Sequence, residues 1–255
     1  MRKNEKEDNK MVKQELIQRS PVRIFEKSIH GGLKPGEIGI IAAPSGLGKT
    51  SVLVQIALDK LLQTKKVIHV SFTQHTDYVL AWYEDIFNEF ISKKNLENAR
   101  EVKNELIKNR VLMNFNQDGI SGDQILRSLK AMIVDGGFAA EALIVDGFHF
   151  SPGDRERIAK VKQFAGDLNL SVWYSCTVSG GAGFHGTKPQ GVENFYDKRD
   201  IPLVVKDYTE LLDVVIVLEP KPDHIELTVS KDRDIYNPEH MALRLDPKTL
   251  LILEQ

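Results

Sequence analysis

The sequence predicts an α/β fold in which helices flank a mainly parallel sheet, with an antiparallel extension at the C-terminal end. Between residues 38 and 178, runs rich in Val and Ile alternate with long amphipathic stretches. Parallel strands need such long crossovers, which are usually helical. From residue 211 onward, strand-like runs follow one another with turns and no helical stretch, which favours antiparallel pairing.

The first segment, residues 1–20, is rich in charged residues and lacks the apolar stretch of a secretory signal. We expect a charged tail or a short exposed helix there. The remaining residues, 21–255, are enough for one large domain with a sizeable core.

The N-terminal half of the domain opens with turn signals, Gly-Gly and Pro-Gly, at residues 31–36. The apolar run that follows them predicts a short buried strand at 38–44. Further Val-rich runs predict strands at 65–73 and 110–116. Apolar residues at helical spacing predict helices at 49–63, 77–94 and 96–109.

The C-terminal half continues the alternation and then changes. Strands are expected at 142–148 and 170–178, and helices at 121–137 and 155–168. The extension is expected to contain strands at 211–219, 224–231, 241–246 and 249–254. The Gly-rich stretch 179–202 fits neither pattern, and loops of that length inside a domain are usually functional or disordered.

Composition excludes several classes of protein. The net charge is −2, so binding to nucleic acid would need a local basic patch. The single cysteine, Cys176, excludes an internal disulfide framework and fits a reducing cytoplasm. No apolar run approaches the roughly 18 to 20 residues of a membrane span. The seven histidines show no metal-ligand spacing, which argues against zinc.

The loop after the first strand carries the strongest motif. Ala43 is followed, after four residues, by Gly48-Lys49-Thr50, a P-loop pattern with Ala in place of the first Gly. Backbone amides of such a loop, together with the helix N-terminus, form a cradle for phosphate. An ordinary strand-to-helix turn is the alternative. The predicted nucleotide-binding residues are Ser45, Gly46, Leu47, Gly48, Lys49, Thr50 and Ser51.

A second acid is needed to hold the metal of a P-loop site. Asp146 ends the apolar run at 142–146, at the carboxyl edge of the sheet where ligands gather. We therefore predict Thr50 and Asp146 as the Mg²⁺ residues. A helix cap or turn former is the alternative for Asp146.

On these residues the chain resembles RecA-like ATPases, in particular their replicative-helicase (DnaB-type) and KaiC-type branch. Three stretches carry the resemblance: "GGLKPGEIGIIAAPSGLGKTSVLVQIA", "VKQFAGDLNLSVWYSC", and "ELLDVVIVLE" followed by "LTVSKDRD". The resemblance implies a RecA-like P-loop core that binds ATP and Mg²⁺. It also implies a homo-oligomer, either a hexamer-type ring or a filament, and a DNA-contacting loop at residues 179–200.

The same resemblance gives Lys231 and Arg233 a catalytic role, as a finger that reaches the γ-phosphate on a neighbouring subunit. Residues i and i+2 of a strand share a face, so we expect both cations to project together while Asp232 points away. A solvated hairpin tip with mixed charges is the alternative.

The glutamate that activates water in this branch is missing after the second strand, where the chain has Thr73-Gln74. Gln74 is the predicted substitute, because a glutamine orients water in small GTPases. It cannot accept a proton as a carboxylate does. The polar sensor of the branch is also altered, and Ser175 or Thr177 would have to serve.

Two functions stay open. The first is an oligomeric ATPase acting on single-stranded DNA, for which the long loop offers His185, Lys188, Lys198 and Arg199. The second is a hydrolysis-deficient switch or scaffold, favoured by Thr73-Gln74. A small-molecule kinase is disfavoured because no Arg-rich lid follows Asp146. Trp82, Tyr83, Phe87 and Phe90 have helical spacing and are expected in the core, and His149 is expected to pack at a strand end.

Overall fold

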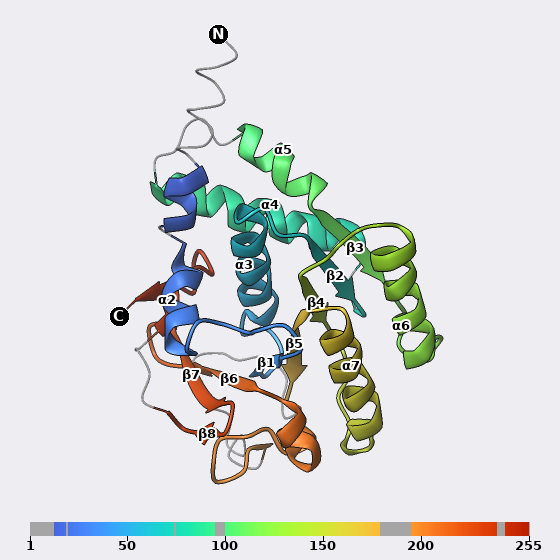
Figure 1. The fold of residues 1–255 in the computed structure, drawn as a ribbon. Helices are drawn as coiled ribbons and strands as arrows, with labels where there is room; N and C mark the ends of the chain where they lie inside the picture. The colour runs from blue at the N-terminus through green and yellow to red at the C-terminus, as the bar shows by residue number, and fades with distance from the viewer. Residues whose placement is uncertain are drawn as a thin grey trace.

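The computed structural model describes residues 13–18, 20–73, 75–94, 100–178, 195–238 and 243–254, and the fold below refers to these (Figure 1). The helices are α2 (Pro21–Ser28), α3 (Lys49–Leu62), α4 (Thr76–Lys94), α5 (Arg100–Lys108), α6 (Gly122–Lys130) and α7 (Arg155–Asp167). The strands are β1 (Ile38–Ala43), β2 (Val67–Ser71), β3 (Arg110–Asn114), β4 (Ala142–Asp146), β5 (Ser171–Thr177), β6 (Val214–Pro220), β7 (Ile225–Asp232), β8 (Ile235–Tyr236), β9 (Leu243–Leu245) and β10 (Ile252–Glu254).

One mixed sheet runs through the domain in the order β10-β9-β7-β6-β1-β5-β4-β2-β3, with β8 paired to β7. The strands from β6 to β3 in this order pair in parallel. The strands β7, β8, β9 and β10 pair antiparallel. The predicted α/β class, with a mainly parallel sheet and a C-terminal antiparallel extension, is confirmed.

The boundary of the extension differs from the prediction. We expected β6 to belong to the antiparallel part, but it lies parallel to β1. A 3₁₀ helix at Leu203–Leu211, which the sequence pattern did not predict, precedes β6 and lets the chain enter the sheet in the parallel sense. Antiparallel pairing therefore starts at β7.

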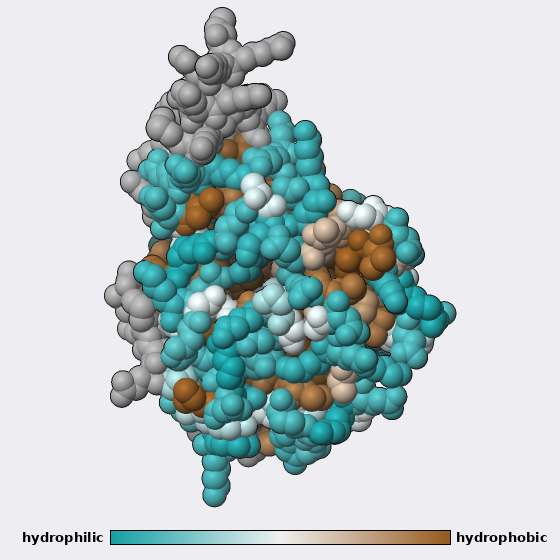
Figure 2. Space-filling model, viewed as in Figure 1, coloured by the Kyte–Doolittle hydropathy of each residue, from teal (hydrophilic) through white to brown (hydrophobic). Residues whose placement is uncertain are grey.

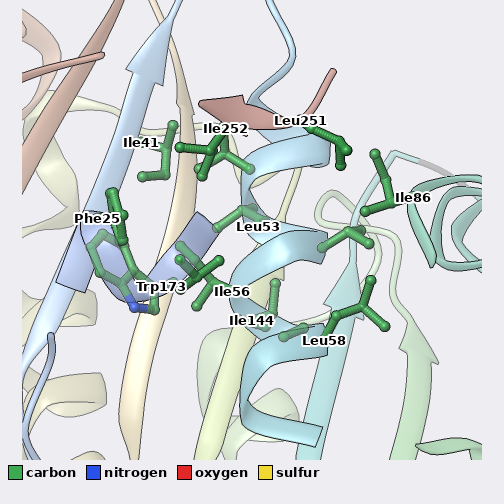
Figure 3. Packing of buried hydrophobic residues seen from close by; sticks show 14 of the residues in the cluster. Phe25, Ile41, Leu53, Ile56, Leu58, Ile86, Ile144, Trp173, Leu251 and Ile252 are labelled. Atoms are coloured by element: carbon green, nitrogen blue, oxygen red, sulfur yellow. The ribbon is translucent and has the colours of Figure 1, made fainter. Parts of the chain in front are cut away.

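Two apolar layers cover the sheet. On one face α2, α3, α4 and α5 contribute to an apolar layer that includes Phe25, Leu53, Ile56 and Trp173. Figure 3 shows part of this layer. On the other face α6, α7 and the 3₁₀ helix pack over the sheet. Residues 51–62 of α3 are all buried, because this helix lies between the sheet and its neighbouring helices. From residue 51 to residue 62, α3 is thus packed on every side.

The close packing of the layers constrains individual positions. A Cβ atom at Gly39 would lie 2.5 Å from the Trp173 ring, so only glycine fits at this point of β1. Figure 2 shows hydrophilic residues over most of one face, with hydrophobic residues exposed in separate patches. None of the described helices has both the length and the apolar character that a membrane span requires.

The N-terminal segment makes more contacts than a tail would. Residues 13–18, expected as a charged tail or a short exposed helix, are helical, but the helix is not wholly exposed, because Leu16 is fully buried in the core. Lys13 pairs with Glu105 of α5 at 2.6 Å. The helix α2 that follows starts at Pro21, whose fixed φ suits a first helical position.

Candidate nucleotide-binding site

The loop that carries the P-loop pattern lies between β1 and α3, at the carboxyl edge of the parallel strands. Gly46 and Gly48 have φ angles of +83° and +84°, which glycine adopts at no steric cost. A Cβ at Gly48 would also lie 2.6 Å from Leu245 Cδ2. The chain therefore needs glycine at Gly48 for both its backbone and its packing.

Lys49 is almost completely buried at the first turn of α3. Its Nζ donates to the carbonyl oxygens of Ala43 at 3.1 Å and Pro44 at 2.8 Å. Burial lowers the pKa of Lys49 to about 8, against the opposing effect of nearby Cys176 and Asp146. Among the described residues no carboxylate forms an ion pair with this ammonium, so it is available to an incoming anion.

The two predicted metal residues lie in contact. The Thr50 hydroxyl donates to Asp146 Oδ2 at 2.8 Å, and Asp146 is only 4% exposed at the end of β4. The described residues hold no cluster of three or more His, Cys, Asp or Glu suited to a metal. Mg²⁺ at a phosphate site needs no such cluster, since it takes one or two protein oxygens together with phosphate oxygens and waters. The pair fits that requirement.

The turn after Asp146 is held by neutral polar groups. Gly147 N donates to Ser175 Oγ at 2.8 Å. Gly147 has φ +78°, and a Cβ there would lie 2.3 Å from Thr73 Oγ1. Thr73 and Ser175, which the sequence placed at the water-activating and sensor positions, thus meet at this turn. Gln74, the predicted water-orienting residue, lies outside the described residues.

A cavity of about 400 Å³ joins these groups. It is lined by Ser45, Gly46, Gly48, Lys49, Thr50, Thr73, Trp82, Asp146, Gly147, His149, Ser175, Thr177 and Leu250. Leu47 is buried and its side chain belongs to the apolar core instead. Trp82 packs against that core as expected, but it also lines the cavity. His149, expected to pack at a strand end, is exposed at the cavity.

The C-terminal turn reaches the P-loop helix, which the sequence analysis missed. Ser51 Oγ donates to the carbonyl oxygen of Leu250 at 2.6 Å, and Gln55 Nε2 donates to the same oxygen at 2.9 Å. Gln55 Oε1 in turn accepts from Ile252 N at 2.9 Å. The sequence did contain a signal for this contact. Gln55 is the one amide side chain in the apolar helix α3, and a buried amide needs hydrogen-bond partners from another part of the chain.

Lys231 and Arg233 lie elsewhere, and the expected geometry is wrong. β7 ends at Asp232, and Arg233 follows in a turn with φ +53°, so the two cations do not extend from one strand face. Lys231 is buried and donates to Thr209 O at 2.8 Å and to Leu212 O, and burial lowers its pKa.

Arg233 is bound within its own chain. It pairs with Glu37 at 2.7 Å, and it donates to the carbonyl oxygens of Ile29 and Gly32, each at 2.7 Å. It also pairs with the buried Asp232, which pairs in turn with His30. Glu37 precedes β1, so this cluster lies about 20 Å from the P-loop at about 3.3 Å per strand residue.

The predicted DNA loop, residues 179–200, lies mostly outside the described residues. In its described end, Arg199 pairs with Asp197 at 3.2 Å and stacks over Tyr236 at 4.3 Å from the ring centre.

Comparison with known proteins adds no identity: no family model matches the chain, and no curated protein matches it either. Functional inference therefore depends on the geometry of this site.

Proposed function

We propose that the chain is a RecA-like P-loop protein that binds ATP with Mg²⁺ and works as a slowly hydrolysing, nucleotide-dependent switch. The observation that carries the proposal is the contact of Thr50 with Asp146 beside the buried Lys49, at the mouth of a cavity of about 400 Å³. A cation, a hydroxyl and a carboxylate in this arrangement match the needs of a metal-bound triphosphate.

Each group has a separate task in binding. Backbone amides of the loop around Gly46 and Gly48 donate to phosphate oxygens. Lys49 exchanges its two carbonyl partners for phosphate oxygens, so its ammonium keeps hydrogen bonds in both states. Thr50 and Asp146 would hold Mg²⁺, which supplies positive charge at the β- and γ-phosphates.

Slow hydrolysis follows from what lines the cavity. Asp146 is the single carboxylate among the described lining residues, and it would be engaged in holding Mg²⁺. Thr73 is neutral and cannot take a proton from water at ordinary pH. Gln74 as a water-orienting residue stays a prediction, and the exposed His149 is the other titratable side chain beside Asp146 and Lys49. In small GTPases a glutamine without an arginine finger supports only slow turnover.

The position of Arg233 favours the switch over the motor. A finger acting on a neighbouring subunit would have to leave Glu37 and two backbone carbonyls, and would remove a cation from the buried Asp232. Uncompensated buried charge is costly. Assembly into a ring or filament, and contact with single-stranded DNA through residues 179–200, remain predictions that rest on the resemblance alone.

The test is calorimetric titration of the protein with ATP, with and without Mg²⁺. Wild type should bind in a Mg²⁺-dependent manner, and Lys49→Ala should weaken binding about 100-fold, the loss typical of a charge-assisted contact in a desolvated site. Lys65→Ala, which removes a half-buried lysine beyond the far end of α3, should leave binding unchanged. No heat from wild type with Mg²⁺ and ATP would refute the proposal.

Turnover measured on the same samples separates the two functions. We expect less than about 1 s⁻¹, below the usual range for enzymes, with or without single-stranded DNA. Turnover that rises many-fold with DNA, together with a mass in solution of several chains, would favour the motor.

A further inference from the structure

Two large apolar side chains, Trp82 and Leu250, line the nucleotide cavity, while its other side chains are mainly polar. We infer that the base of the bound nucleotide lies against these two residues, which makes the site bind a nucleotide more tightly than a bare triphosphate chain. The inference rests on the proposed binding of ATP and adds the part of the site that recognises the nucleoside.

The phosphate end of the cavity fixes where the base can go. Lys49 and the Thr50–Asp146 pair define the position of the phosphates. Ser51, the next residue, is joined to Leu250 by a hydrogen bond of 2.6 Å. Leu250 thus lies next to the residues that would hold the phosphates. Of the three parts of a nucleotide only the base has large apolar faces, so it matches the two apolar side chains that line the cavity.

Leu250 is held firmly in its position. Its φ is +56°, a left-handed conformation that is unusual for leucine. Its carbonyl oxygen accepts from Ser51 and Gln55, and its amide donates to Asp246 O at 2.7 Å. Figure 3 shows Ile252 near Leu53 of α3 and Leu251 on the side of Ile86 of α4. The turn is therefore a preformed surface attached to the P-loop helix.

Trp82 supplies the aromatic surface. It belongs to α4, whose inward face is buried through Val79, Tyr83 and Ile86. Trp82 lies three residues after Val79 and four before Ile86, at the edge of that face, and is only half-buried. One part of the indole packs against the core and the remaining part lines the cavity. A ring fixed in this way offers a flat surface for stacking.

The inference predicts that mutation can weaken binding of the base without weakening binding of the triphosphate. In Trp82→Leu and Leu250→Gly, ATP should bind about tenfold more weakly than in wild type, as expected when a base loses its stacking partner. Glycine suits the left-handed backbone at residue 250, so the turn keeps its shape. Inorganic tripolyphosphate, which has no base, should bind both variants with wild-type affinity.

The experiment titrates ATP and tripolyphosphate, each with Mg²⁺, into wild type, the two variants and Tyr78→Leu. Tyr78 is an exposed aromatic residue on the same helix and serves as the matched control. Tryptophan emission is a second readout: ATP should change it in wild type but not in Trp82→Leu, and tripolyphosphate should change it in neither.

Three outcomes would overturn the inference. The first is unchanged ATP affinity in both variants. The second is an equal loss for ATP and tripolyphosphate, which would mean that the mutations disturb the phosphate cradle. The third is wild type that binds tripolyphosphate as tightly as ATP. If wild type binds neither ligand, the proposed function itself fails, and that result is distinct from the other three.

Discussion

Because burial lowers the pKa of Lys49 to about 8, the affinity for ATP should depend on pH in the range where few other groups titrate. Bound triphosphate would hold the ammonium protonated, so the pKa rises on binding and the protein takes up a proton. Below pH 8 the free protein already carries that proton. Above pH 8 binding must first protonate Lys49, so affinity falls as pH rises.

The size of the effect follows from the pKa. With a value near 8, about three quarters of Lys49 is protonated at pH 7.5 and about a tenth at pH 9, so affinity should fall about eightfold between them. At pH 8 binding should take up about half a proton. The neighbouring Cys176 does not interfere, since burial raises the pKa of its thiol to about 12.

Calorimetry in two buffers with different ionisation enthalpies measures the proton uptake directly, and titrations at several pH values give the affinity. Lys49→Arg is the control, because a guanidinium stays protonated throughout this range and its affinity should not change with pH. Wild-type affinity that is flat between pH 7.5 and 9, with no proton uptake, would refute the assignment of Lys49 as a buried phosphate ligand.

The remaining predictions concern the metal, the stability of the fold and the distant arginine. Asp146→Asn should keep binding of ATP but reduce its dependence on Mg²⁺, measured by titration with and without the metal. Lys49→Met should raise the free energy of unfolding by about 1 to 3 kcal/mol in urea at pH 7, since it removes a buried charge without an ion pair. The gain should shrink above pH 8, where native Lys49 loses its proton before the unfolded chain does. Arg233→Ala should lower the free energy of unfolding by about 2 to 4 kcal/mol while ATP affinity stays the same. A variant that loses turnover at unchanged stability would instead favour a role of Arg233 at the γ-phosphate of a neighbouring subunit.

The regular part of the fold was predictable because its signals are local. The strands β1, β2, β4 and β5 are short apolar runs, and α3 and α7 carry apolar residues at helical spacing. The rule that parallel strands present their carboxyl ends at one edge then placed Asp146 near the P-loop without further information. The contact between Thr50 and Asp146 follows from that rule.

The features that could not be predicted depend on partners far away in the sequence. The ion pair of Arg233 with Glu37 joins residues 196 positions apart, and no local pattern indicates it. Gln55 and Leu250 are likewise separated by 195 positions. The parallel pairing of β6 depends on the 3₁₀ helix before it, whose mixed pattern predicts no regular crossover. Each required knowledge of where the C-terminal strands lie.

These long-range contacts bear on the proposed site, because they hold the amino end of β1 and the first turns of α3, on the two sides of the glycine loop. At the amino end Glu37 is held by Arg233, and Ile38 N donates to Asp213 Oδ2 at 2.7 Å. Asp213 also pairs with Lys162 of α7 at 2.5 Å. On the other side of the loop, the C-terminal turn is bonded to the first turns of α3 through Ser51 and Gln55.

If the loop binds phosphate as proposed, these contacts would keep its glycine cradle in shape before a ligand arrives, so little free energy would be spent on ordering it. The same contacts oppose the use of Arg233 as a finger, because its release would loosen the strand that carries the P-loop. A motor that hydrolyses ATP by inserting this arginine would therefore weaken its own neighbouring site at each step. The proposed switch has no such conflict, because the nucleotide would bind between two braced segments and Arg233 would stay in place. The conflict is the physical reason to favour the switch.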